Sequence, residues 1–215
     1  MDDPAVDVRE LAANFTDIEL ANRWFGGIGP VLREVLALGA VRVLDVGCGS
    51  GDFARALLRR ARTAGRRLDV VALDASEAVL SIARERTGDE PALRFVLGDA
   101  AALAFDDASF EVATCNLALH HFEPPEAIRM LRELRRVASR APLVCDLVRS
   151  PAAFVATVAF TRCIARNRLT KHDGPLSVRR AYTPAEALAL AQRAGWRAPR
   201  VRRSAFFRML LSDGA

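Results

Sequence analysis

The chain has 215 residues, of which 51% are hydrophobic and 27% are charged, and its formal net charge at pH 7 is +5. This length suits one well-packed domain and is barely enough for two. The positive charge comes mostly from arginines spread along predicted helices. Because no cluster of basic and aromatic residues accompanies them, we expect no nucleic-acid partner.

The 4 cysteines lie far apart and show no metal-ligand spacing. Three of them stand in or beside apolar runs, which is typical of buried free thiols in a reducing cytoplasm. The chain opens with acidic residues rather than a signal peptide. Its most apolar stretch, residues 152–165, is interrupted by Arg162 and is too short to span a membrane. We therefore expect a cytoplasmic protein without a metal or a membrane span.

Two helices are predicted ahead of the first strand. Phe15, Ile18 and Leu20, followed by Trp24 and Phe25, indicate the first helix, which glycines then interrupt. Apolar spacing over residues 31–38 predicts the second, ending at Gly39. Trp24 and Phe25 could close over a ligand, and simple core packing explains them equally well.

Short apolar runs then alternate with helical segments. The predicted strands are residues 41–46, 68–74, 93–97, 110–115 and 142–148. The intervening helices follow a glycine loop, a cap at Ser76 and a start at Pro124. Strands alternating with helices in this way predict an α/β fold with a doubly wound parallel sheet.

The alternation changes after the fifth strand. An apolar helix is expected over about 152–168, followed by a polar loop at 171–177 that contains glycine and proline. Thr183, Pro184 and Glu186 predict a helix with a capping box. Two last strands, expected over 196–203 and 205–211, would form an antiparallel hairpin at the sheet edge.

We interpret the whole chain, 1–215, as a single domain. Helices within residues 1–40 would precede the sheet, and residues 150–182 would form an inserted cap over the substrate.

The chain is organised around residues 41–52, where a buried strand leads into a glycine loop and then a helix. Gly47, Gly49 and Gly51 let the backbone turn sharply and approach a ligand closely. A strand, glycine loop and helix in this order are typical of nucleotide binding. Turn glycines alone would also explain the triplet, so the neighbouring acids decide between ligands.

Aspartates at successive strand ends indicate the nucleotide. A dinucleotide site requires a small residue where this chain has Asp52, and Asp45 would repel a pyrophosphate. Asp74 ends the second strand where an acid binds ribose hydroxyls, and Asp99 ends the third. Any one of them could instead be a helix cap. Together they predict an adenosine ligand that carries a cation and no phosphate, as S-adenosylmethionine does.

With these residues the sequence resembles the class I S-adenosylmethionine-dependent methyltransferases. The matching segments span about residues 40–150 and are 44–51, 73–76, 98–100, 109–112 and 116–121. The chain looks most similar to the small-molecule branch that includes quinone-biosynthesis enzymes. The resemblance implies a Rossmann-like, seven-stranded sheet, mostly parallel with one antiparallel strand at the edge, and helices on both faces.

The resemblance also implies which residues contact the cofactor, each next to a strand end. The contacts expected at its methionine end and sulfonium are Asp45, Gly47, Gly49, Asn116 and Leu117. The contacts expected at its ribose and adenine are Asp74, Ala75, Asp99 and Ala100.

Histidines are the candidate bases, since imidazole suits proton removal from a phenol or enol near neutral pH. His120 and His121 are adjacent, so they point in different directions and one of them is expected to be structural. His172 beside Asp173 is a third candidate, and a surface turn explains it equally well. The candidate substrate contacts also include His172, Arg180 and Tyr182. A core aromatic explains Tyr182 equally well.

Methyl transfer from a sulfonium requires mainly alignment of donor and acceptor and exclusion of water. We therefore expect an O-methyltransferase, or a C-methyltransferase, of a small apolar phenol, quinol or polyketide-like metabolite, acting as a monomer or homodimer. One alternative is a cofactor-binding regulatory or partner protein without catalysis. The other is a nicotinamide-dependent oxidoreductase, which Asp45 and Asp52 disfavour.

Overall fold

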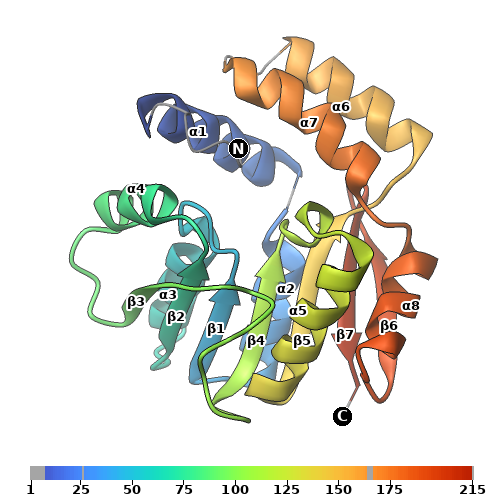
Figure 1. Ribbon diagram of the computed structural model, residues 1–215. Helices are drawn as coiled ribbons and strands as arrows, with labels where there is room; N and C mark the ends of the chain where they lie inside the picture. Colours follow the sequence, from blue (N-terminus) through green and yellow to red (C-terminus); the bar gives the residue numbers. More distant parts are fainter. Residues whose placement is uncertain (1–7, 26, 164–166, 215) are drawn as a thin grey trace.

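The computed structural model describes residues 8–25, 27–163 and 167–214. Its centre is a seven-stranded sheet in the order β3-β2-β1-β4-β5-β7-β6 (Figure 1). The strands are β1 (Arg42–Val46), β2 (Asp69–Asp74), β3 (Leu93–Leu97), β4 (Phe110–Asn116), β5 (Ala138–Leu147), β6 (Pro199–Ser204) and β7 (Arg208–Asp213). β1 to β5 are parallel, and β7 is antiparallel to both β5 and β6. The predicted fold class is confirmed, with β7 inserted next to the edge strand β6.

Helices cover both faces of this sheet, which explains the continuous apolar runs of its central strands. They are α1 (Val8–Phe25), α2 (Gly29–Leu38), α3 (Asp52–Thr63), α4 (Glu77–Thr87), α5 (Pro124–Val137), α6 (Pro151–Cys163), α7 (Arg168–Arg180) and α8 (Pro184–Arg193), with a short 3-10 helix η1 (Leu119–His121). Along β1, Leu44 and Val46 join the core under α5 and α8, whereas Val43 joins the core under α2 and α3. Buried free thiols are confirmed for three of the cysteines: Cys48, Cys115 and Cys145.

The predicted loop at 171–177 is wrong, because these residues belong to α7. Asn167 caps the helix by accepting a hydrogen bond from the Leu169 N–H at 2.8 Å. Gly174 serves close packing rather than a turn: a Cβ there would lie 2.9 Å from Cγ2 of Thr161 on α6. Pro175 lies inside the helix, where its missing N–H removes one helical bond. The α6–α7 contact thus overrides the local preference of the Gly-Pro pair.

Helices α1, α6 and α7 lie above the carboxyl ends of the parallel strands (Figure 1). α1 is fastened to α7 by polar contacts. Thr170 Oγ1 donates to the buried Asn14 Oδ1 at 2.7 Å, and the Asn167 N–H donates to Asp17 at 2.9 Å. We call α1, α6 and α7 the cover. Within the described ranges, no helix has both the length and the apolar character needed to cross a membrane.

The predicted capping box of α8 is confirmed. The Glu186 N–H donates to Thr183 Oγ1 at 3.3 Å, and the Thr183 N–H donates to Glu186 Oε2 at 2.8 Å. These two bonds satisfy donors that the first helical turn would otherwise leave unpaired.

We expect Thr183→Ala to lower the free energy of unfolding by about 1 kcal/mol, because one capping acceptor is lost. For a chain of this size that corresponds to a melting temperature about 3 °C lower by calorimetry. Thr183→Ser retains the hydroxyl and is the control, expected to melt close to the wild type. Equal melting of Thr183→Ala and wild type would contradict the role given to the cap.

Candidate active site

The glycine loop after β1 is held against the end of β2. The N–H groups of Gly47 and Cys48 donate to the Leu73 carbonyl at 2.8 and 3.0 Å, and the Gly49 N–H donates to Asp74 Oδ2 at 3.0 Å. Gly47 and Gly49 have φ of 69° and 52°, which favours glycine. A Cβ at Gly47 would also lie only 2.8 Å from the Cβ of Ala118. Close packing and left-handed backbone thus both require glycine at position 47.

Asp45 is the buried acid of the site, with 1% of its surface exposed. Its Oδ1 accepts from Thr114 Oγ1 at 3.0 Å and from Asn116 Nδ2 at 3.2 Å. Its Oδ2 is buried and finds no partner among the residues that the structure describes, and the same holds for Asn116 Oδ1. Two buried acceptor oxygens of neighbouring side chains thus lack a donor within the described residues.

The electrostatics of this corner of the site, around Asp45 and Asn116, favour a cationic ligand. Burial raises the pKa of Asp45 to about 7 despite the hydrogen bonds from Thr114 and Asn116, and the charges of Asp52 and Asp74 raise it further. Burial also raises the pKa of Asp52. An ammonium or sulfonium group would satisfy the orphaned oxygens and offset this negative charge, whereas a phosphate would add to it. The corner therefore fits the amino-acid end of S-adenosylmethionine.

α1 contributes polar groups to the glycine loop that sequence reasoning missed. Glu19 accepts hydrogen bonds from Ser50 Oγ at 3.0 Å and from Arg55 at 2.8 Å, and Asn22 donates to Asp52 at 3.3 Å. Glu19 and Asn22 lie on α1, which the sequence predicted from its apolar spacing alone. They tie the cover to the loop that it overlies.

The predicted ribose and adenine contacts lie at the ends of β2 and β3. Asp74 is half-buried, and its Oδ1 accepts from the Ser76 N–H at 3.1 Å. Asp99 is exposed, and its Oδ1 accepts from the Ala101 N–H at 2.8 Å, so it also caps a local turn. Ala75 is exposed and Ala100 is buried. Both carboxylates keep lone pairs that could accept from a ligand.

The chain turns sharply where β4 ends. Leu117 has φ of 55°, a strained conformation for a bulky residue, and its N–H donates to the Cys145 carbonyl at 2.8 Å. This turn leads directly into η1 and brings His120 next to β5.

His120 and Asp146 form a buried pair at the end of β5. His120 Nδ1 lies 2.7 Å from Asp146 Oδ1, and the His120 N–H donates to Asp146 Oδ2 at 2.8 Å. Burial would raise the pKa of Asp146, but its interactions with His120 and the hydrogen bond from the Leu147 N–H outweigh this effect and hold the pKa below its usual range. Sequence reasoning missed Asp146, although an acid inside the apolar run 142–148 was a usable signal. His121 is exposed, and its ring centroid lies 4.4 Å from that of His120, so the expectation that the two side chains point in different directions is wrong.

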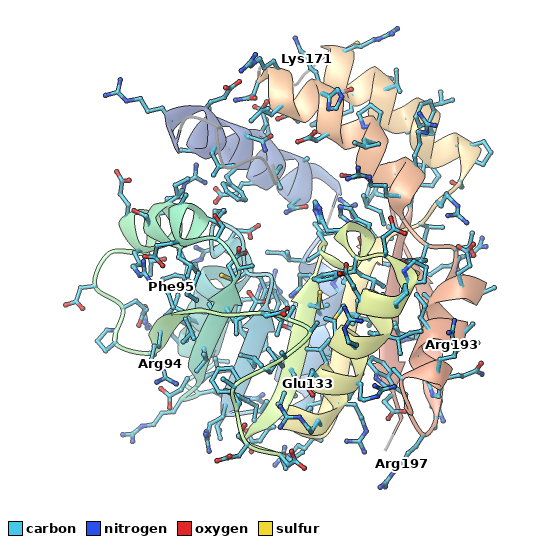
Figure 2. All side chains as sticks on the ribbon, in the orientation of Figure 1. Arg94, Phe95, Glu133, Lys171, Arg193 and Arg197 are labelled. Atoms are coloured by element: carbon cyan, nitrogen blue, oxygen red, sulfur yellow. The ribbon has the colours of Figure 1, made fainter. Side chains whose placement is uncertain are left out.

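The structure does not bring the other candidates to this corner. The His172 side chain is 77% exposed and contacts Asp173 at 3.0 Å. Figure 2 shows the preceding residue, Lys171, at the end of α7 that lies away from the sheet. Arg180 is exposed, and Tyr182 is buried with its hydroxyl donating to the Phe122 carbonyl at 2.7 Å. The side chains of Trp24 and Phe25 lie outside those that the structure describes.

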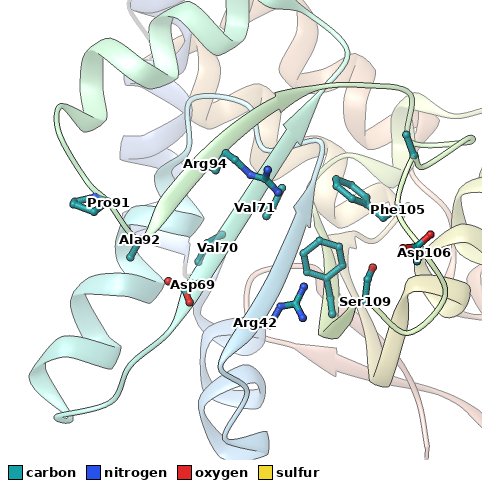
Figure 3. Close-up of a pocket in the computed structure, with 12 residues that line it drawn as sticks. Arg42, Asp69, Val70, Val71, Pro91, Ala92, Arg94, Phe105, Asp106 and Ser109 are labelled. Carbon is teal, nitrogen blue, oxygen red and sulfur yellow. The ribbon is translucent and has the colours of Figure 1, made fainter.

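A hollow of about 550 Å³ lies elsewhere, near the amino ends of β1, β2 and β3 (Figure 3). Arg42, Asp69 and Arg94 line it, together with Phe105 and Phe110. It exists because residues 98–109 form no helix over this part of the sheet. We place the site at the carboxyl ends instead, where the orphaned oxygens and the histidine–aspartate pair lie.

Known proteins resemble this chain in sequence and in fold. Residues 43–140 match the family model described as a methyltransferase domain. Solved structures with the same fold include an S-adenosylmethionine-dependent methyltransferase from Aquifex aeolicus, with a TM-score of 0.62, 18% identity and coverage of 84% of this chain and 87% of that one. Another is magnesium protoporphyrin IX methyltransferase from Synechocystis with bound S-adenosylhomocysteine, with a TM-score of 0.61, 19% identity and coverage of 92% and 84%.

The chain is therefore similar to methyltransferases in sequence over residues 43–140 and in its overall fold. Together with the acidic surroundings of Asp45, this likeness favours S-adenosylmethionine over a nicotinamide dinucleotide as the ligand. Curated relatives include demethylmenaquinone methyltransferases from Thermotoga maritima, 37% identical over 110 residues, and from Staphylococcus aureus, 31% identical over 117 residues. These alignments cover 51% and 54% of this chain and 44% and 46% of the relatives, so the chain spans about half of their length.

We expect Asp45→Asn to stabilise the cofactor-free chain at pH 8. The folded pKa of Asp45, about 7, lies above its unfolded value of about 3.9, so its ionisation destabilises the fold as pH rises through this window. The variant should melt about 10 °C higher than wild type at pH 8 and show a smaller difference at pH 5.5, because the pKa difference between the folded and unfolded chain corresponds to about 4 kcal/mol. A variant that melts lower at pH 8 would contradict the assigned charge state.

We also expect the affinity of the wild type for S-adenosylmethionine to rise with pH. Below pH 7 Asp45 is protonated, and binding a cation must first remove that proton. Isothermal titration should give a Kd about tenfold lower at pH 8 than at pH 6. Asp45→Asn should bind far more weakly at both pH values, and a pH dependence that persists in this variant would assign the effect to another group.

Proposed function

We propose that this chain methylates a hydroxyl oxygen of a small, apolar phenolic, quinol or polyketide-like metabolite, with His120 as the base. The observation that carries the proposal is the buried His120–Asp146 pair beside the end of β4, where Asn116 stands. Likeness to curated relatives named demethylmenaquinone methyltransferases supports a quinol-type acceptor.

In this proposal, Asp45 and Asn116 accept hydrogen bonds from the amino group of the cofactor, which fills their orphaned oxygens. The backbone of Gly47 and Gly49 borders the same end. Asp74 accepts from the ribose, with Ala75 nearby, and Asp99 and Ala100 border the adenine, while Leu117 lines the floor. When bound, S-adenosylmethionine supplies an activated methyl group.

Asp146 fixes the orientation of the His120 ring. Because the carboxylate engages both the backbone N–H and Nδ1 of His120, the ring cannot turn, and Nε2 is the nitrogen left to take a proton. The buried carboxylate then stabilises the imidazolium that forms. Removing the acceptor's hydroxyl proton makes its oxygen, or a neighbouring ring carbon, a better nucleophile.

The cover completes the proposal. α7 contacts both α1 and η1, so this helix packs against the segment that carries His120. We infer that residues 150–182 enclose an apolar acceptor and limit access of water, which strengthens charge interactions beneath them. α6, with its apolar sequence, would supply much of the enclosing surface.

The deciding experiment is turnover by the purified chain with S-adenosylmethionine and a panel of phenols and reduced naphthoquinones. We expect a singly methylated product, and mass spectrometry with fragmentation assigns the methyl group to oxygen or carbon. Tight cofactor binding without turnover of any acceptor would favour the non-catalytic alternative instead.

His120→Gln is expected to lower kcat by about 100-fold or more, because the base is lost. Asp146→Asn should lower kcat by a similar factor, because it no longer holds the reactive tautomer. Cofactor affinity, measured by titration, should change little in either variant. His121→Gln alters the exposed neighbour and should leave kcat within about twofold, so equal losses at both histidines would contradict the assignment.

A further inference from the structure

Arg208, the first residue of β7, is a buried cation that the mechanism above does not use. Only 7% of its surface is exposed. Its Nε is buried without a hydrogen-bond partner, and no ion pair to its guanidinium occurs in the described part of the chain. Burial lowers the pKa of this guanidinium, which the nearby Cys145 and Asp146 only partly offset. A guanidinium that stays charged while buried and unpaired lowers the stability of the fold, and a bound anion would remove this loss.

Strand register places Arg208 at the edge of the sheet formed by the carboxyl ends of the parallel strands. We call this the working edge. Arg208 lies opposite Leu147, and Asn116 lies opposite Cys145. Because side chains alternate along a strand, Arg208, Leu147, Cys145 and Asn116 share one face. Arg208 stands two residues further toward the carboxyl end of β5 than Asn116 does, which is nearer the cover. It therefore lies beyond the expected sulfonium contact, on the acceptor's side.

The backbone before Arg208 forms a turn. Phe206 and Phe207 have φ of 56° and 58°, a left-handed conformation that costs a bulky residue about 1–2 kcal/mol. The Phe207 carbonyl is fastened to the Val148 N–H at 2.8 Å. Residues 205–207 form the turn of the β6–β7 hairpin, where left-handed backbone is an ordinary conformation. The hydrogen bond from Val148 to Phe207 fixes the start of β7 against the end of β5.

The nearest acid cannot neutralise Arg208 by pairing with it. The oxygens of Asp146 accept from the N–H and Nδ1 of His120 and from the Leu147 N–H. A guanidinium matches a carboxylate through two parallel hydrogen bonds, and it also binds an ionised hydroxyl. The partner that Arg208 lacks within the described chain is thus an anionic oxygen.

We propose that Arg208 binds an anionic oxygen group of the methyl acceptor, so that the acceptor is an aromatic acid rather than a neutral phenol. This inference rests on the proposed function and narrows it. A carboxylate or acidic hydroxyl would lie on Arg208 while a second hydroxyl faces His120, because Arg208 pairs with Leu147 and His120 binds Asp146, two successive residues at the carboxyl end of β5. Arg208 then selects the acceptor and fixes which hydroxyl meets the base.

The test measures binding of matched aromatic probes by the full chain saturated with S-adenosylhomocysteine. The probes are 2-naphthoate, the neutral 2-naphthamide of the same shape, and 2-naphthol. We expect 2-naphthoate to bind at least about tenfold more tightly than the amide. Arg208→Met should abolish this preference. Arg208→Lys should retain part of it, because lysine keeps the positive charge but lacks the two parallel N–H donors of a guanidinium. Arg203→Met changes an exposed arginine of the same hairpin and should retain all of it.

The outcomes of this test distinguish a carboxylate ligand from an acidic hydroxyl and from no anionic ligand at all. A preference for 2-naphthoate identifies a carboxylate, whereas binding of 2-naphthol that strengthens as it ionises, and only with Arg208 present, identifies an acidic hydroxyl. Equal binding of acid and amide, no binding of any probe, or a preference that survives in Arg208→Met would overturn the inference. An unchanged Kd for S-adenosylhomocysteine shows that each variant is folded. Failure of the wild type to bind S-adenosylhomocysteine would instead refute the proposed function.

Discussion

The rest of the site depends on one buried carboxylate that the chain leaves half satisfied. Asp45 has hydrogen bonds on one oxygen only, and two further acids lie near enough to raise its pKa. A buried carboxylate with one unpaired oxygen destabilises the fold. A cationic ligand bound at the end of the first strand would remove this destabilisation. The glycine loop supports the same ligand, because it keeps side chains out of the space beside that carboxylate.

Opposite charges mark the two ends of the working edge. Asp45 on β1 lacks a cation, and Arg208 on β7 lacks an anion. β4 and β5 lie between them and carry Asn116 and the His120–Asp146 pair. A cationic donor at one end and an anionic acceptor at the other would meet over the base. Preorganised charges of this kind require no rearrangement during the reaction, which is the most effective form of electrostatic assistance.

The cover is built from segments that the chain supplies far apart in sequence. α1 precedes the sheet, whereas α6 and α7 follow the fifth strand, and polar contacts between α1 and α7 join them. The same α1 bonds to the glycine loop through Glu19 and Asn22. Movement of α1 would therefore disturb the cofactor loop and the acceptor side together, which couples the two halves of the site.

The sequence by itself determined the features that depend on neighbours along the chain. The glycine loop, the Ser76 cap, the capping box at Thr183 and the alternation of strands and helices all arise from local hydrogen bonds and periodicity. Only the tertiary structure decided which distant residues meet. It paired His120 with Asp146, buried Arg208 beside β5, left His172 exposed and made a helix of residues 171–177. Strand register and helix packing set those contacts, and neither is encoded within a short stretch of residues.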